Sequence, residues 1–192
     1  MIRNLFTTIL MFISVDAYAD IENWYFTLNA GGADITNPSD VETVISNAEN
    51  TYGTDRASVS VDFGFYWPIL DNSLLLGLAG NNSADSVNTQ LGTNVIRHSA
   101  ILTGVSVIKY LSPEIGNGIF FRGDIGSASS RYTLLNNTFA LENGSGSGIL
   151  LGVGYGFKVS NESRLVLSLN TINIMINGDE YSSTQFMIGG LW

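Results

Sequence analysis

Residues 148–159 read GILLGVGYGFKV, and this stretch decides the fold. Large apolar side chains stand at every odd position from Ile149 to Val159, and glycine stands at most of the even positions. Because successive side chains of a β-strand point to opposite faces, the alternation predicts a strand with one apolar face. The stretch is long enough to cross a bilayer, for which a tilted strand needs about 9–11 residues.

The same alternation recurs along the chain and predicts eight strands of about 9–13 residues, close to the length that a spanning strand needs. The segment 95–111 is more uniformly apolar, so its pattern does not settle which residues share a face. The eight segments are Trp24–Ala30, Ala57–Trp67, the one opened by Leu74–Leu78, 95–111, Ile119–Ile125, Ile149–Val159, Leu165–Leu169 and Thr184–Trp192.

The connections between these segments alternate in length. Short turns are expected at 68–73, 112–118 and 160–163, and long polar links at about 32–56, 81–94, 129–145 and 171–181. Short periplasmic turns and long extracellular loops are typical of outer-membrane barrels. We therefore expect an all-β fold, an eight-stranded antiparallel up-and-down transmembrane β-barrel, with both chain ends on the periplasmic side.

The N-terminus has the pattern of a secretory signal peptide. Arg3 is followed by the apolar stretch Leu5–Val15 and by the small-x-small site Ala17–Ala19. A transmembrane helix is the alternative, but eleven apolar residues reach only about half of a ~30 Å hydrocarbon core. We expect residues 1–19 to be a cleaved signal peptide and residues 20–192 to form a single barrel domain.

Composition narrows the function classes. Charged residues make up 13% of the 192 residues, about half the ~25% usual for soluble domains, and 45% are hydrophobic. The net charge of −9 leaves no basic face for phosphates, so we expect no nucleic-acid partner. The chain has no Cys, which excludes a disulfide scaffold and any Cys-based metal or redox site.

Three tryptophans form a predicted periplasmic girdle. Trp24 opens the first strand, Trp67 ends the second and Trp192 ends the last, and each lies in the apolar phase of its strand. In an up-and-down barrel all three positions fall at one rim. Trp favours the bilayer interface, where its ring is apolar and its N–H stays hydrated.

Charged residues in the opposite phase predict an interior polar network of Asp62, Arg122, Asp124, Lys158 and Arg164. The first three should lie at similar depth, so that the guanidinium and the carboxylates neutralise each other away from water. Because eight strands leave a lumen just wide enough for side chains, we expect a plug, with a polar conduction path as the alternative.

The first long link contains a predicted helix. Ser39 and Glu42 have the spacing of a capping box, and Val41, Val44 and Ile45 follow at helical spacing. We expect two or three turns that pack as a lid over the barrel mouth. The alternative is a helix that binds a partner or the membrane surface.

The sequence offers little for catalysis. His98 is the only histidine, and its neighbour Ser99 would point to the opposite face of a strand. We therefore expect no enzyme and no cofactor or metal, although some outer-membrane barrels are lipid A hydrolases that use Ser, His and a carboxylate. A histidine at the rim of the fourth strand is the simpler interpretation.

The chain resembles small Gram-negative outer-membrane barrels of the opacity-protein, surface-antigen and OmpA-transmembrane type. The resemblance rests on the N-terminal pattern, the eight segments, the stretches IFFRGDIGSASS and GILLGVGYGFKV, and the terminal TQFMIGGLW. It implies a C-terminal signal for the barrel-insertion machinery, which Phe186, Ile188 and Trp192 match. It also implies location in the cell outer membrane, with lipid as the surrounding partner.

Two functions follow from this interpretation. The first is a surface barrel that presents loops for adhesion, host or envelope interaction, or membrane integrity, with a host or envelope ligand as its partner. The alternative is a small porin-like channel for solutes or hydrophobic molecules. The rival fold is a secreted barrel of the lipocalin type, in which the same alternation would run with the apolar face inward.

Overall fold

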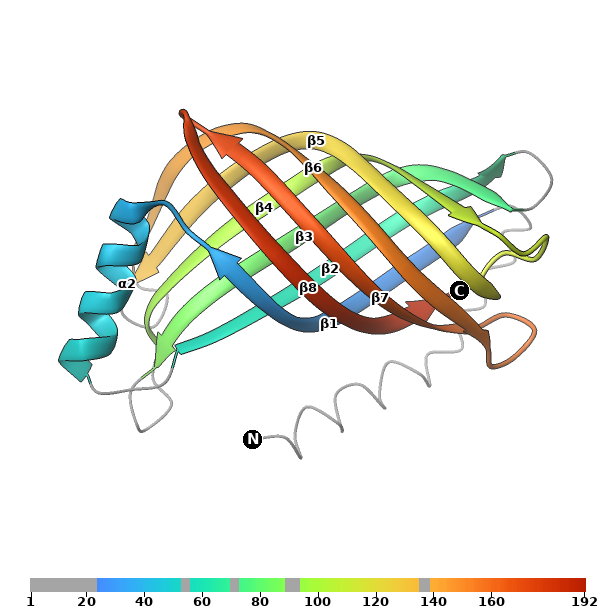
Figure 1. Cartoon of the computed structure of the whole chain (residues 1–192), viewed down its shortest axis with the longest axis horizontal. Coiled ribbons are helices and arrows are strands. Elements are labelled where there is room, and N and C mark those ends of the chain that lie inside the picture. Colours follow the sequence, from blue (N-terminus) through green and yellow to red (C-terminus); the bar gives the residue numbers. More distant parts are fainter. Residues whose placement is uncertain (1–23, 53–55, 70–72, 89–93, 135–138) are drawn as a thin grey trace.

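The computed structural model describes residues 24–52, 56–69, 73–88, 94–134 and 139–192, and the predicted signal peptide lies outside this part of the chain (Figure 1). Eight antiparallel strands close into a barrel in sequence order, β1 pairing with β8. The predicted fold class is confirmed. The elements are β1 (Tyr25–Thr36), α2 (Ser39–Tyr52), β2 (Arg56–Ile69), β3 (Leu74–Asn88), β4 (Asn94–Tyr110), β5 (Gly118–Leu134), β6 (Phe139–Lys158), β7 (Arg164–Ile176) and β8 (Asp179–Leu191).

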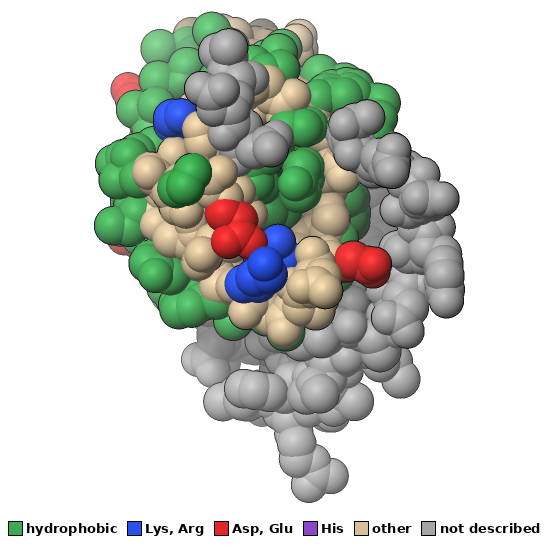
Figure 2. Space-filling model, turned by 90° about the vertical axis from the view of Figure 1, so that its right-hand side faces the viewer, with side chains coloured by type: hydrophobic (Ala, Val, Ile, Leu, Met, Phe, Trp, Pro, Cys, Tyr) green, Lys and Arg blue, Asp and Glu red, His purple; other side chains and the backbone are tan. Residues whose placement is uncertain are grey.

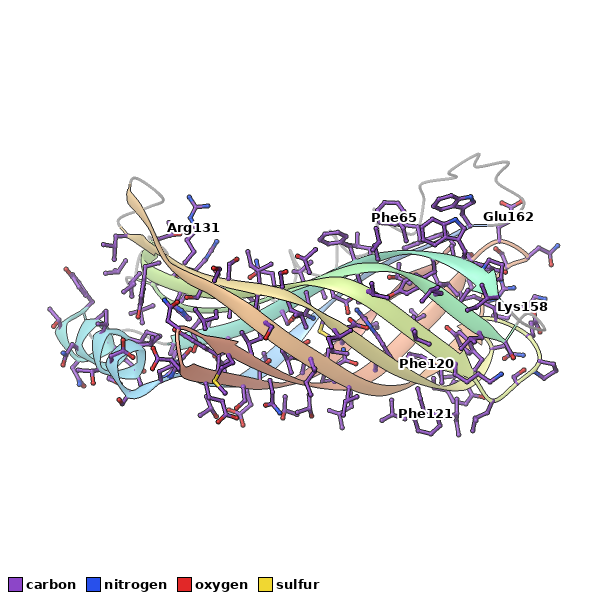
Figure 3. All side chains as sticks on the ribbon, turned by 90° about the horizontal axis from the view of Figure 1, so that it is seen from above. Phe65, Phe120, Phe121, Arg131, Lys158 and Glu162 are labelled. Carbon is purple, nitrogen blue, oxygen red and sulfur yellow. The ribbon has the colours of Figure 1, made fainter. Side chains whose placement is uncertain are left out.

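The apolar face of the barrel wall points outward. Phe63, Leu151 and Phe186 are 48%, 63% and 61% exposed, whereas Asp62 and Arg122 are buried. Figure 3 shows the alternation at one step of β5, where the consecutive residues Phe120 and Phe121 lie on opposite sides of the wall. A lipocalin-type barrel has the reverse orientation, so that alternative is wrong.

An exposed belt of large apolar side chains surrounds the half of the barrel where β1 begins and β8 ends. A soluble protein rarely exposes a contiguous apolar patch of more than a few hundred Å², so a belt of this extent requires lipid. Among the described residues, no helix is long and apolar enough to cross a membrane. The belt residues include Val59, Val61, Phe63, Phe65, Leu76, Leu78, Val105, Val107, Ile119, Phe121, Ile125, Ile149, Leu151, Val153, Tyr155, Phe157, Leu169 and Phe186.

Above this belt, the inward-facing residues of β7 change from polar to apolar. On β7, Leu169 faces outward and Asn170 is buried, whereas two residues later Thr171 is exposed and Ile172 is buried. On this strand the inward side thus changes from polar at Asn170 to apolar at Ile172 and beyond, where the wall is surrounded by water. The inversion marks the upper edge of the membrane-spanning part.

The long polar links are mostly strand, which corrects the sequence-based expectation. The link expected at 171–181 is the upper end of β7 and β8, joined by a two-residue turn at Asn177 and Gly178, both with positive φ. The strands run to 12–20 residues, longer than a membrane needs, and extend past the belt. Within the described chain only the first connection, which holds α2, keeps the character of a long loop.

The interior is filled in layers. A lower apolar cluster includes Tyr66, Tyr110, Phe120 and Leu191, at the end of the barrel where β1 begins and β8 ends. An upper apolar cluster lies at the opposite end and includes the inner side chains of α2. Figure 1 shows α2 at that end of the barrel. Polar side chains occupy the space between the two. The upper cluster comprises Val41, Ile45, Val87, Ile96, Ala100, Leu102, Ala128, Leu150, Ile172, Ile174, Ile176 and Tyr181.

The position of the belt can be tested by placing a charge on it. Val153 is the middle of five outward apolar residues on β6, and we expect Val153→Arg to lower the free energy of unfolding in lipid vesicles by about 2–4 kcal/mol. Ser129→Arg is the matched control, since Ser129 is also exposed but lies above the belt, and it should cost less than about 1 kcal/mol. Equal losses in urea titrations of the two variants would contradict the assignment.

Candidate functional site

Three of the five predicted network residues meet in the middle of the lumen. Arg122 on β5 binds Asp62 on β2 through Nη1, and its Nη2 lies 2.7 Å from Asp124 Oδ2. All three side chains are buried. Asn29 Nδ2 donates to Asp62 at 2.5 Å, and Ser106 Oγ donates to Asp124 at 2.5 Å. One guanidinium thus lies between two carboxylates, each of which also accepts a neutral hydrogen bond.

Lys158 and Arg164 do not join this network, which corrects that part of the prediction. Lys158 Nζ lies 2.8 Å from Glu114 Oε1, and Arg164 Nη2 lies 3.5 Å from the same oxygen. Figure 2 views the barrel from this end, where acidic and basic side chains lie next to each other and hydrophobic ones follow part of the rim. The hydrogen bond from Lys158 lowers the pKa of Glu114. Both residues have the inward phase but stand at the ends of their strands.

A second polar layer above Arg122 was not predicted as a network. Asn81 and Gln185 exchange side-chain hydrogen bonds of 3.0 and 3.1 Å across the lumen. Gln185 Nε2 also donates to Ser83 at 2.6 Å. Asn81 and Ser83 were assigned to a loop, so their inward direction could not be read from the sequence.

The predicted helix is present as α2 and is longer than expected, at 14 residues. Val41 and Ile45 are buried in the upper cluster, which places α2 over the barrel mouth as a lid. Val44 is 45% exposed and belongs to the outer face. Glu42 was expected in a capping box with Ser39, but its carboxylate binds a guanidinium on β2.

The buried carboxylate of Asp85 joins several elements at the end of the barrel that α2 covers. Asp85 on β3 accepts hydrogen bonds from Asn37 Nδ2 and Arg56 Nη2, both at 2.7 Å, and from Ser58. Arg56 also donates to both oxygens of Glu42, at 2.5 and 3.0 Å. This hydrogen bonding lowers the pKa of Glu42 and raises that of Arg56. Asp85 falls within the polar link expected at about 81–94, so this role is not predicted from the sequence.

His98 is buried inside β4, not exposed at a rim. Its ring stacks on Tyr181 at 5.4 Å and contacts Tyr132 at 4.8 Å, and its Nε2 has no hydrogen-bond partner. It lies above the belt, which on β4 includes Val105 and Val107. Burial lowers the pKa of His98 to about 4. A neighbouring cavity of about 10 Å³ has room for a single water molecule.

The tryptophans lie at the ends of three adjacent strands: Trp24 precedes β1, Trp67 is on β2 and Trp192 follows β8. The ring centroids of Trp24 and Trp67 are 4.1 Å apart, and Trp192 stacks on Phe26 at 6.1 Å. Trp192 also exchanges backbone hydrogen bonds of 2.9 and 3.0 Å with Phe26, so the last residue takes part in closing the barrel. Phe186 is exposed and Ile188 half-buried on β8. Their role as an insertion signal stays a prediction.

Comparison with solved structures finds the same architecture at low sequence identity. Neisserial surface protein A is 15% identical, with 88% of this chain and 95% of that one covered and a TM-score of 0.52. Ail, the attachment invasion locus protein of Yersinia pestis in complex with the heparin analogue sucrose octasulfate, is 6% identical, with 90% and 100% covered and a TM-score of 0.50. No protein-family model and no curated protein matches the sequence.

These similarities confirm the expected resemblance to small outer-membrane barrels at the level of the fold. The apolar belt and the closed wall make the chain a transmembrane barrel of the outer membrane, with the start of β1 and the end of β8 at the periplasmic end and α2 at the extracellular end. Among the described residues, no group of three or more His, Asp or Glu side chains could hold a metal ion.

The interior network can be tested by removing its cation. Arg122→Ala leaves two buried carboxylates without their partner, so we expect the free energy of unfolding to fall by about 3–5 kcal/mol. Adding Asp62→Asn and Asp124→Asn to Arg122→Met should recover most of this loss, because no buried charge then remains unpaired. Urea titration in vesicles measures all three proteins. A triple variant less stable than Arg122→Ala would contradict the pairing.

The burial of His98 predicts a pH dependence of stability. The folded-state pKa of about 4 lies below the ordinary 6.5, so below pH 6.5 the unfolded chain binds a proton that the folded chain excludes. Stability should therefore fall as the pH drops from about 6.5 to about 4 and level off below that range. Relative to His98→Gln, the wild-type midpoint in urea should decrease over this interval. Parallel curves for the two proteins would exclude the effect.

Proposed function

We propose that the chain is a surface anchor: a plugged outer-membrane barrel that holds α2 and the extracellular strand ends in place for binding to a host or envelope surface. The observation that carries this proposal is the filled interior. Two apolar clusters flank the Arg122 network, so the described inward side chains occupy the lumen from the lower end to the lid. This packing disfavours the porin-like alternative.

The way α2 is held supports a role in presenting its outer face to a partner. Its inner face is fixed by Val41 and Ile45, and the Glu42–Arg56 ion pair joins it to β2. Its outer face carries Val44 and Tyr52, which are 45% and 49% exposed. An apolar side chain and an aromatic one on a rigid support are the kind of groups that bind partner proteins. We infer a non-catalytic role, since the His98 ring is buried between Tyr132 and Tyr181, away from any substrate outside the barrel.

The proposal is tested by adhesion of cells that display the barrel. A non-adherent Gram-negative host expressing the protein should gain binding to immobilised matrix proteins or cultured epithelial cells. We expect Val44→Ser with Tyr52→Ser to weaken this binding by about 5–30-fold, the effect of losing one or two kcal/mol at an interface. Asp40→Ser and Asn50→Ser together are the matched control on exposed positions of α2.

Two further measurements separate the alternatives. Each variant should remain folded, because the lid residues Val41 and Ile45 are unchanged. The gel mobility of boiled and unboiled samples checks this. Planar-bilayer recordings test the channel function directly. Steady unitary conductance by the wild type, together with no gain in adhesion, would overturn the anchor and favour the channel.

A further inference from the structure

His98 lies beside the carboxylate that holds the lid α2 in place. In the barrel wall, His98 of β4 is the cross-strand partner of Asp85 of β3, and both side chains are buried. Asp85 accepts hydrogen bonds from Asn37, in the link that leads into α2, and from Arg56. Arg56 in turn binds Glu42 on α2. The one imidazole of the chain is therefore next to the group through which α2 is attached.

The lid helps to keep water away from this imidazole. His98 stacks on Tyr181, which belongs to the upper apolar cluster together with Val41 and Ile45 of α2. Asn37 lines the same small cavity as His98. This cavity of about 10 Å³ has room for one water molecule at most. While the lid is closed, a positively charged imidazole would therefore lack a hydration shell.

Most groups packed around His98 carry no charge that could replace this water. The ring contacts the phenols of Tyr132 on β5 and Tyr181 on β8, and phenols are uncharged in acid. Ile172 and Ile174 of β7 line the same cavity and are apolar. The other residues that line this cavity are also neutral: Ile35, Asn37, Ser83, Ala100, Ser182 and Ser183.

The charged groups around His98 do not offset its burial. Among the residues that the structure describes, these groups are Asp85 of β3 and Asp40 of α2, with Arg56 of β2 on the far side of Asp85. Burial lowers the pKa of His98 to about 4, although the two carboxylates act in the opposite direction. Both oxygens of Asp85 already accept hydrogen bonds from the link and from β2, so neither is free for a second N–H donor.

We propose that His98 is a pH-sensitive switch that releases the lid in acid. When α2 and its link leave the mouth of the barrel, water reaches the imidazole, so the open form binds a proton much more tightly than the closed form. Acid therefore shifts the equilibrium toward the open form. A protonated imidazole has N–H donors on both ring nitrogens, and it competes with Asn37 and Arg56 for the oxygens of Asp85.

The pH range of the release follows from the two forms of the lid. In the open form the imidazole has its ordinary pKa of 6.5, and in the closed form its pKa is about 4. The closed lid is most stable above pH 6.5 and loses stability as the pH falls toward 4. From about pH 7.5 to about pH 5, the ratio of open to closed lids should rise about 30-fold. Because the hydrogen bond from Arg56 lowers the pKa of Glu42 below 4.5, their ion pair persists over this range.

Thiol labelling measures the opening of the lid, since the chain has no Cys and one can be introduced at a time. Ile45→Cys places a thiol on the buried inner side of α2, and Asn50→Cys places one on an exposed position of the same helix. Val166→Cys places a third in the lower cluster. Each barrel is refolded in lipid vesicles and labelled with dithiodipyridine at several pH values. The rate for Ile45→Cys divided by that for Asn50→Cys cancels the pH dependence of the thiol itself.

We expect this rate ratio to rise about 30-fold from about pH 7.5 to about pH 5, and to stay constant when His98→Gln is added. Val166→Cys should remain protected, which shows that the lid opens without unfolding of the barrel. The proposal is overturned by a constant or falling ratio in the protein that keeps His98, or by an equal rise with His98→Gln. Labelling of Val166→Cys in step with Ile45→Cys would overturn it as well.

A second measurement leaves the contacts of Ile45 intact. Hydrogen exchange of the α2 amides, corrected for the intrinsic rate at each pH, compares the otherwise unchanged chain with His98→Gln. Protection of α2 should decrease in acid only in the chain that keeps His98, while the amides of the membrane-spanning strands stay protected. Equal protection of α2 in the two proteins at every pH would refute the switch.

The release of the lid does not rest on the proposed function, but its effect on adhesion does. If α2 presents the adhesive face, cells that display the wild type should bind more weakly at about pH 5 than at about pH 7.5, and cells with His98→Gln should bind equally at both. Labelling that responds to pH in a barrel that never adheres would support the switch and refute the anchor. Adhesion by a barrel whose lid labelling is constant would refute the switch alone.

Discussion

The contact on which the structure depends is the pairing of β1 with β8. In lipid, every backbone N–H and C=O must be satisfied within the protein, so a sheet with free edges cannot span the membrane. Ten register pairs from Thr27↔Leu191 to Thr36↔Ser182 remove the edges. Close approach is part of this seam, since a Cβ on Gly31 would lie 1.8 Å from the carbonyl oxygen of Phe186. The C-terminal Trp192 extends the pairing by one more residue through Phe26.

Because the barrel closes within lipid, its apolar side chains face outward and its polar ones inward, the reverse of a soluble protein. This made the face of each residue in the membrane-spanning half predictable. Because large apolar residues must face the acyl chains, period two alone assigned Phe63 and Leu151 to the outside and Asp62, Arg122 and Asp124 to the lumen. The same rule gave the correct phase for Lys158 and Arg164 but not their depth. A repeat of two residues specifies a face and carries no information about distance from the strand end.

The extracellular half could not be predicted by that rule, because the solvent outside the wall changes from lipid to water. On β7 the buried residue is Asn170 at membrane depth and Ile172 two residues above. In the upper halves of the strands, polar residues point outward and small or apolar residues point inward. A search for strands with an apolar outer face therefore interprets such a stretch as a loop. Asp85 and Asn81 were assigned to loops for this reason, although both are buried on β3.

The backbone pairing of β1 with β2 ends at Gly32↔Val59, and side-chain hydrogen bonds replace it above that pair. Over the span that lacks β1–β2 pairs, Asp85 receives Asn37 from the link after β1 and Arg56 and Ser58 from β2. Arg56 then reaches Glu42, so the same connection fixes α2. A ladder would pair β1 and β2 directly, whereas here side-chain hydrogen bonds join both to Asp85 on β3. The link after β1, the start of β2 and the lid are therefore all joined through one buried carboxylate on the neighbouring strand β3.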